Sequence, residues 1–420
     1  MQLNINTFNS LKYRDFRLYF IGQCISLIGT WMQQIAMSWL LYNLTGSIAM
    51  LGAIFFISQA PILLITPFSS AFIDKVNKRK ILIITQGASM LHAIILTILT
   101  LTNTIEVWQL VLLSFFLGII NAIDMPTRQA YYTSLVPKEN LTNAVALNSA
   151  IINGARLIGP AIGGVIVGLV GEGGCFLVNS ISYIFVIIAL FMIKSEQIII
   201  NQNKTRVVED IKEGYKYMKK HVPIKVLIFT TLIFCFLIFP ITTFIPAFTK
   251  DVLGGNSEKL GLILSVVGVG SFISAMFLAS RKGLLGLEKL QLAAIFVSSI
   301  ISIFYFFVTS LWITLILSAI LGFSMVCTIA TTNTMLQALT DLNMKGRIMG
   351  YYTMCFLGGS ALGSLLLGWL SKVFTLPYTM AASGIICVIG IIIYLPYLER
   401  VTQQTKDKYI ENGIIPEIPV

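Results

Sequence analysis

Twelve long apolar runs divide the chain, and this feature limits what it can fold into more than any other. A helix needs about 20 apolar residues to cross the ~30 Å hydrocarbon core of a bilayer, and the runs have about that length or more. They do not alternate polar and apolar residues, so they favour helices over the strands of a transmembrane barrel. The predicted spans are 16–42, 48–73, 81–102, 107–132, 141–170, 176–193, 224–248, 260–279, 290–308, 312–339, 348–370 and 378–396. The sequence therefore predicts an all-α integral membrane protein.

The composition also indicates a lipid environment. Of the 420 residues, 56% are hydrophobic and only 11% are charged, whereas about 25% are charged in an ordinary soluble domain. The formal net charge is +11, but Lys and Arg lie in the short gaps between apolar runs instead of in one basic patch. This distribution fits contact with anionic lipid head groups and argues against a nucleic-acid partner.

The uneven distribution of Lys and Arg among the gaps predicts the orientation of the chain. Gaps after even-numbered spans contain most of them, including the basic stretch 194–225, whereas gaps after odd-numbered spans contain only Lys250, Lys259 and Lys372. Basic loops stay on the cytoplasmic side, so both termini are expected in the cytoplasm. The first 13 residues are polar and show no cleavage site, so the first span is expected to remain as an uncleaved anchor.

One long polar interruption predicts the domain organisation. Residues 194–223 separate an N-terminal half of six spans, 1–193, from a C-terminal half of six spans, 224–396, and a cytoplasmic tail is expected over 397–420. Within the interruption, apolar residues recur at helical spacing between 207 and 218 with lysines on the other side. This pattern predicts an amphipathic helix on the inner leaflet, with a solvated helical linker as the alternative.

A repeated glycine pattern indicates that the two halves are related. GARLIGPAIGG (154–164) and GGSALGSLLLG (358–368) align their glycines at a shift of 204 residues, and each opens the fifth span of its half. Small residues at this spacing allow two helices to approach closely. The recurrence predicts two parallel six-helix halves related by a pseudo-two-fold axis. The helix-packing residues of the first copy are Gly159, Pro160, Gly163 and Gly164.

The loop after the second span, SSAFIDKVNKRK, combines one acid with a basic cluster. Lys75, Lys78 and Arg79 are what the orientation of the loop alone demands. Asp74 is unusual there, because an acid gains nothing from the positive-inside bias. It could face the positive end of a neighbouring helix or one of these bases, so these four residues are candidates for a gating motif.

The fourth span carries an acid and a base in IINAIDMPTRQAYY. A lone charge at depth costs at least ~2.5–3.5 kcal/mol, so Asp124 needs a partner, and Arg128 and Arg156 are the candidates. One hypothesis is a fixed ion pair that joins spans 4 and 5. The other is a carboxylate that is protonated in one state and carries a proton. Tyr131 and Tyr132 at the end of the span are typical of the interfacial aromatic belt.

Together these features resemble the major facilitator superfamily. The loop matches the pattern S-x-x-x-D-K-x-x-K-R-K, where the family has Gly at Ser70 and Arg at Lys75, and span 5 matches the antiporter motif G-P-x-x-G-G. GTWMQQIAMSWL (29–40), the stretch 124–164 and MKGRIMGYYTM (344–354) resemble the bacterial exporter branch that contains the enterobactin exporter and macrolide-efflux-like proteins. One departure is Ser114, where the span-4 motif of proton antiporters has Arg.

The resemblance implies a secondary transporter of the bacterial cytoplasmic membrane. Its two halves would rock about a cavity lined by spans 1, 4, 7 and 10, and export a small amphipathic compound, a siderophore or a drug-like molecule. It would work as a monomer in contact with membrane lipids, with H+ as the coupling ion and no cofactor. Polar residues in those spans are the cavity candidates: Gln23, Ser26, Thr30, Gln33, Asn121, Thr231, Thr243, Thr331 and Asn333.

No competing chemistry stands out in the sequence. It has no Walker loop, no Ser/His/Asp set and no Cys or His at a metal-ligand spacing, so an enzyme is not expected. Two alternatives remain open: a lipid or lysolipid flippase, and a membrane receptor with a transporter fold that binds a ligand without moving it. Flux through the reconstituted protein would separate the receptor from the transporters.

Overall fold

A computed structural model describes residues 5–73, 76–194, 207–281, 283–341 and 343–411. All regular structure in these ranges is helical, with no strand among them. The α-helices are α1 (Arg14–Thr45), α2 (Ile48–Ile73), α3 (Lys78–Leu101), α4 (Val107–Thr133), α5 (Leu141–Met192), α6 (Val207–Lys220), α7 (Val222–Leu237), α8 (Ile241–Asp251), α9 (Ser257–Ser280), α10 (Leu287–Phe304), α11 (Leu311–Leu339), α12 (Lys345–Phe374) and α13 (Leu376–Glu411). Three short 3-10 helices are η1 (Ile5–Lys12), η2 (Lys138–Asn140) and η3 (Tyr305–Phe307).

The predicted spans are found as helices, and the all-α membrane fold is confirmed. Ten helical segments of the described chain are long and apolar enough to cross a membrane. One of them contains α5, whose 52 residues would extend for about 78 Å, far more than one crossing needs. It breaks at Gly171, whose φ of 76° is in the left-handed region that favours glycine, so α5 provides two spans. α1, 32 residues long, provides the first predicted span and is not among these ten segments.

Local sequence signals determine where several helices begin and end. α1 ends at Gly46, whose φ of 56° suits glycine and whose N–H donates to the Tyr42 carbonyl. Asn77 precedes α3 and accepts from the amide of Lys80. Predicted span 7 is interrupted after Leu237, and Pro240 immediately precedes α8.

The chain divides into two compact units. Unit 1 consists of Met1–Gly46, Ile57–Lys204 and Gly254–Gly268, and in it α3 packs against both α4 and α5, and α5 packs against α1. Tyr131 and Tyr132 are only 0% and 1% exposed and belong to its core. The expectation that they form an interfacial aromatic belt is therefore wrong, because the end of α4 is covered by α1, α3 and α5.

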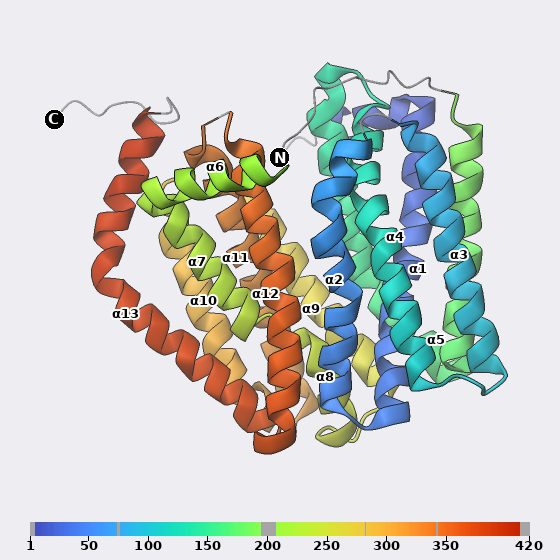
Figure 1. Cartoon of the computed structure of the whole chain (residues 1–420). Helices are drawn as coiled ribbons and strands as arrows, with labels where there is room; N and C mark the ends of the chain where they lie inside the picture. The colour runs from blue at the N-terminus through green and yellow to red at the C-terminus, as the bar shows by residue number, and fades with distance from the viewer. Residues whose placement is uncertain (1–4, 74–75, 195–206, 282, 342, 412–420) are drawn as a thin grey trace. The chain divides into compact units, whose positions relative to one another are not determined.

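Unit 2 consists of Ser47–Phe56, Thr205–Leu253 and Val269–Val420. Here α10 packs against α11 and α13, and α12 packs against α7. α6, which lies in the predicted linker, crosses the end of α7 (Figure 1) and forms an ion pair of 2.7 Å from Glu213 to Arg347 on α12. α13 continues beyond its apolar span to Glu411, so much of the expected tail is helical, with Val401, Thr405 and Tyr409 buried along one face.

The repeated glycines occupy equivalent positions in the two units. A side chain at Gly159 of α5 would meet Trp31 on α1, and one at Gly163 would meet Met32. In unit 2, a side chain at Gly363 of α12 would meet the backbone of Phe236 on α7. In each unit the fifth span therefore packs closely against the first through glycine, as the repeat predicted.

Candidate functional site

The carboxylate of Asp124 is the centre of a buried polar cluster in unit 1. Asp124 is 2% exposed. Its Oδ1 accepts from the hydroxyl of Thr85 at 2.7 Å and from Nε2 of Gln86 at 2.8 Å. Its Oδ2 lies 2.6 Å from Nε of Arg128, one helical turn further along α4. Both oxygens have close donors, as a buried ionised carboxylate requires.

Arg128 connects this cluster to a third helix. Its Nη1 lies 3.4 Å from Oε1 of Gln23 on α1. The Arg128 side chain is 21% exposed, whereas that of Asp124 is 3% exposed. Both residues of the ion pair therefore lie on α4. The further contacts of Asp124 and Arg128 connect α4 to α3 and α1, instead of connecting it to span 5.

Arg156 lies at a different place from this cluster. Its guanidinium carbon is 5.1 Å from the centre of the Trp31 ring on α1, within the range of a cation–π interaction. The expected contribution of Arg156 to the Asp124 pair is not seen in the contacts of the described residues. The aromatic face offers this arginine an alternative partner inside unit 1.

Sequence reasoning missed the donors on α3. Thr85, Gln86, Ser89 and His92 are all buried and recur every three to four residues on one face. A polar stripe of this kind in an apolar span indicates a helix face turned toward protein instead of lipid. Reading α3 for this periodicity would have predicted a polar partner for Asp124.

A second group of hydrogen-bonded polar side chains in unit 1 contains a predicted cavity residue. Gln33 accepts from Nδ2 of Asn179 on α5 at 2.7 Å, and its own amide lies 3.5 Å from Nδ1 of His92. Gln33 is 3% exposed, so this amide connects α1, α3 and α5 inside the unit. Ser114, at the position of the missing arginine, is buried and donates to the Leu110 carbonyl of its own helix.

The remaining cavity candidates have mainly local partners. Thr30 donates to the Ser26 carbonyl, Thr231 to that of Leu227 and Thr331 to that of Cys327. The other contacts pair Thr243 with Ser364 at 3.2 Å and Asn333 with Gln337 at 2.6 Å; Ser26 is buried, and Asn121 is half-buried. Their role in a substrate cavity stays a prediction.

The loop after α2 is described only in part. Asp74 and Lys75 lie outside the described residues, so the gating motif stays a prediction. Lys78 begins α3, and Arg79 donates to the carbonyls of Leu190 at 2.6 Å and Phe191 at 2.7 Å. These carbonyls are in the last turn of α5, where a cation is favourably placed.

Unit 2 contains a polar cluster at corresponding positions. α4 and α11 begin 204 residues apart, at Val107 and Leu311, so Thr328 and Thr332 correspond to Asp124 and Arg128. The side chains that contact Thr332 are uncharged. Gln291 of α10 donates to Thr332 at 2.7 Å, and Thr231 of α7 donates to it at 3.3 Å.

Comparison with known proteins gives a family match over nearly the whole chain. The family described as "Transmembrane secretion effector", a group of major facilitator transporters, matches residues 5–416. A staphyloferrin A transporter of Staphylococcus aureus is 27% identical over 375 residues, which cover 89% of this chain and 94% of the relative. Macrolide efflux protein A of Streptococcus pyogenes is 20% identical over 64% of this chain and 67% of its own length.

Solved structures with the same fold are also transporters. A bacterial homologue of the human lysosomal transporter Spinster covers 96% of this chain and 98% of its own, with a TM-score of 0.73 and 12% identity. A bacterial homologue of the iron transporter ferroportin covers 91% of this chain and 98% of its own, with a TM-score of 0.66 and 17% identity. At these identities the likeness establishes the fold alone.

Proposed function

Because this chain belongs to the transmembrane secretion effector family of the major facilitator superfamily, we propose that it is a secondary active exporter of a small amphipathic compound driven by H+ antiport. Members of the family are multi-pass membrane transporters, not enzymes. The similarity to the staphyloferrin A transporter over 89% of this chain is the observation that supports a siderophore as the first substrate class. The similarity to a macrolide efflux protein supports a drug-like compound as the second substrate class.

Alternating access between the two six-helix halves is the proposed mechanism. Both termini face the cytoplasm of a bacterium, as the distribution of Lys and Arg predicts. The polar residues of spans 1, 4, 7 and 10 line the substrate cavity, and the loop with Asp74 controls its cytoplasmic side. Each half stays rigid through its glycine contacts and its polar cluster while the substrate is moved.

The coupling step is assigned to Asp124. Its carboxylate is buried, so protonation removes a charge that the interior would otherwise have to stabilise. Thr85 already contacts the Leu82 carbonyl at 3.2 Å as well as Asp124, so its hydroxyl has a second acceptor when the carboxylate is neutral. Oε1 of Gln86 is buried and has no hydrogen-bond partner in the described part of the chain, so it can accept the proton of a carboxylic acid once the amide turns. Arg128, partly exposed, is then released toward solvent.

Asp124→Asn tests this assignment in proteoliposomes. The variant is expected to lose uphill transport driven by a pH gradient while it retains exchange of substrate between equal compartments, because asparagine keeps the shape and loses the titratable group. Asp407→Asn, which changes an exposed carboxylate on α13, is the control and should behave as wild type. Uphill transport by the Asp124 variant would show that the proton is carried elsewhere; loss of exchange together with stability would show a structural ion pair.

The substrate class is tested separately in cells. A strain without the gene is expected to retain the exported compound inside and to lose it from the medium, with staphyloferrin A and a macrolide as the two probes. The wild-type gene should restore export in this strain, and the gene with Asp124→Asn should not. Equal amounts of a probe in the medium with and without the gene would exclude export of that probe.

A further inference from the structure

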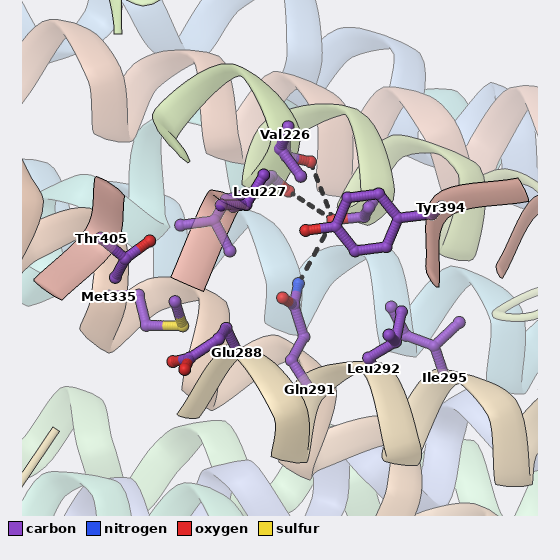
Figure 2. Close-up of a pocket in the computed structure, with 11 residues that line it drawn as sticks. Val226, Leu227, Glu288, Gln291, Leu292, Ile295, Met335, Tyr394 and Thr405 are labelled. Carbon is purple, nitrogen blue, oxygen red and sulfur yellow. Dashed lines mark hydrogen bonds between the residues drawn. The ribbon is translucent and has the colours of Figure 1, made fainter. Parts of the chain in front are cut away.

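A pocket inside unit 2 contains an acid that the transport proposal does not use. It lies between α7, α10, α11 and α13, with a cavity volume of about 10 Å³, roughly the space of one water-sized particle (Figure 2). Its polar lining consists of Thr230, Glu288, Gln291, Tyr394 and Thr405. Glu288 stands in the first turn of α10 and is 7% exposed, so its carboxylate is largely removed from water.

Glu288 has no hydrogen bond or ion pair to its carboxylate among the residues that the structure describes. Within the same residues, the hydroxyls of Thr405 and Tyr409 on α13, 2% and 1% exposed, also have no hydrogen-bond partner. Removing an ionised carboxylate from water is costly unless a cation, a proton or several donors compensate for the lost hydration. The pocket therefore contains the ligand groups of a site and leaves their bonding capacity unused.

The charged surroundings of Glu288 lie mainly on α10 and α13. A second, more open pocket of about 200 Å³ shares Glu288 and Thr405 with the first, and its wall contains Lys289, Lys406 and Tyr409. Tyr394 lines the inner pocket together with Glu288, and α7 and α11 contribute only uncharged side chains there. Lys289 is exposed and Lys406 half-buried, and both line the outer pocket.

We propose that Glu288 and the hydroxyl of Thr405 form a binding site for one small monovalent cation, a sodium ion. A single carboxylate matches a single positive charge, and no group of three or more metal-binding side chains occurs in the described part of the chain. Neutral hydroxyl and amide oxygens, which hard cations accept as ligands, complete the lining. The two lysines repel an entering cation, so they limit its affinity.

Occupancy of this site bears directly on the polar cluster of unit 2. Gln291 follows Glu288 by one helical turn on the same pocket wall (Figure 2) and donates to Thr332 of α11 and, at 3.4 Å, to Thr230 of α7. A cation at Glu288 would thus strengthen the place where α7, α10 and α11 meet. The site is separate from Asp124, and its binding test does not depend on the transport proposal.

The test measures cation binding by the purified full-length protein without substrate. Thermal unfolding is followed while sodium chloride replaces choline chloride at constant ionic strength. Sodium binding is expected to raise the melting temperature by about 2 °C at saturation, and Glu288→Gln should lose this increase. The control Glu399→Gln, at an exposed position of α13, should keep it.

Two further variants keep the test decisive if Glu288→Gln does not fold. Thr405→Val removes a neutral ligand and should weaken sodium binding several-fold. Lys406→Met removes a repelling charge and should strengthen sodium binding, the opposite of Thr405→Val. The proposal is overturned if sodium does not change the melting temperature of the wild type, or if these variants leave the sodium effect unaltered.

Discussion

The polar clusters of the two halves stand at corresponding places but differ in charge. In unit 1, Asp124 and Arg128 form an ion pair on α4, with neutral donors from α3. In unit 2, the corresponding residues of α11 are Thr328 and Thr332, and Gln291 contributes a neutral donor. Both clusters join the first, third and fourth helices of their half.

This difference separates what a six-helix half needs from what a coupled transporter needs. The uncharged cluster shows that hydroxyls and an amide are sufficient to connect the three helices. The ion pair in unit 1 has a higher desolvation cost, and replacement of buried ion pairs by neutral groups is often neutral or stabilising. The presence of this pair in one half therefore supports the proposed role of Asp124 in the transport cycle.

Of the changes that test this comparison, removal of Arg128 should have the largest effect on the stability of the protein. Arg128→Met leaves Asp124 buried without its cation, and breaking a buried pair in this way typically costs about 3–5 kcal/mol. The measurement is the thermal or denaturant stability of the purified protein. The double variant Asp124→Thr with Arg128→Thr copies Thr328 and Thr332 and should recover most of the stability while pH-driven transport stays lost. A double variant as unstable as Arg128→Met would show that the ion pair is needed for folding.

The glycine contacts should respond alike in the two halves. Gly159→Leu and Gly363→Leu force a large side chain against Trp31 and Phe236, so each should cost roughly 1–3 kcal/mol or prevent insertion. Gly154→Leu, where an added Cβ meets nothing within 4 Å, is the control. The measurement is stability and yield of folded protein. A loss confined to one half would contradict the structural equivalence of the two contacts.

The two glutamines should differ because one donates to a charge and the other to a hydroxyl. Gln86→Leu removes a hydrogen bond to a carboxylate, worth about 1.5–3 kcal/mol, whereas Gln291→Leu removes bonds to neutral groups worth about 0.5–1.5 kcal/mol each. In the Asp124→Asn background the effect of Gln86→Leu should fall toward the neutral value, as a double-mutant cycle would measure. An unchanged effect in that background would mean that Gln86 acts through packing instead of through the carboxylate.

Comparison of sequence and structure shows which kinds of contact a pattern can predict. Apolar run length was sufficient for all twelve spans, because a bilayer requires long helices whatever their packing. The equivalent glycine contacts were predictable from the 204-residue repeat. Of the partners of Asp124, Arg128 was predicted because it follows by one helical turn, whereas Thr85 and Gln86 were not, because they lie 39 and 38 residues away on another helix. Burial of Glu288 depends on the helical extension of α13, which its polar sequence did not reveal.

The smallest expected effect concerns the loops after the second span of each half. Arg79 donates to two carbonyls at the end of α5, whereas Arg281, in the corresponding loop, donates to the Leu285 carbonyl four residues further along. Arg79→Gln should therefore destabilise unit 1 by about 0.3–1 kcal/mol, the usual contribution of a cation at a helix C-terminus, and Arg281→Gln should have less effect. Arg79→Lys should retain part of the stability, because an ammonium keeps the charge but cannot reproduce the two-carbonyl contact. Amide hydrogen exchange in the last turn of α5 is the suitable measurement, since a change this small is local. Equal exchange in wild type and Arg79→Gln would show that the loop arginines of both halves are structurally interchangeable, and that the asymmetry between the halves is confined to their buried clusters.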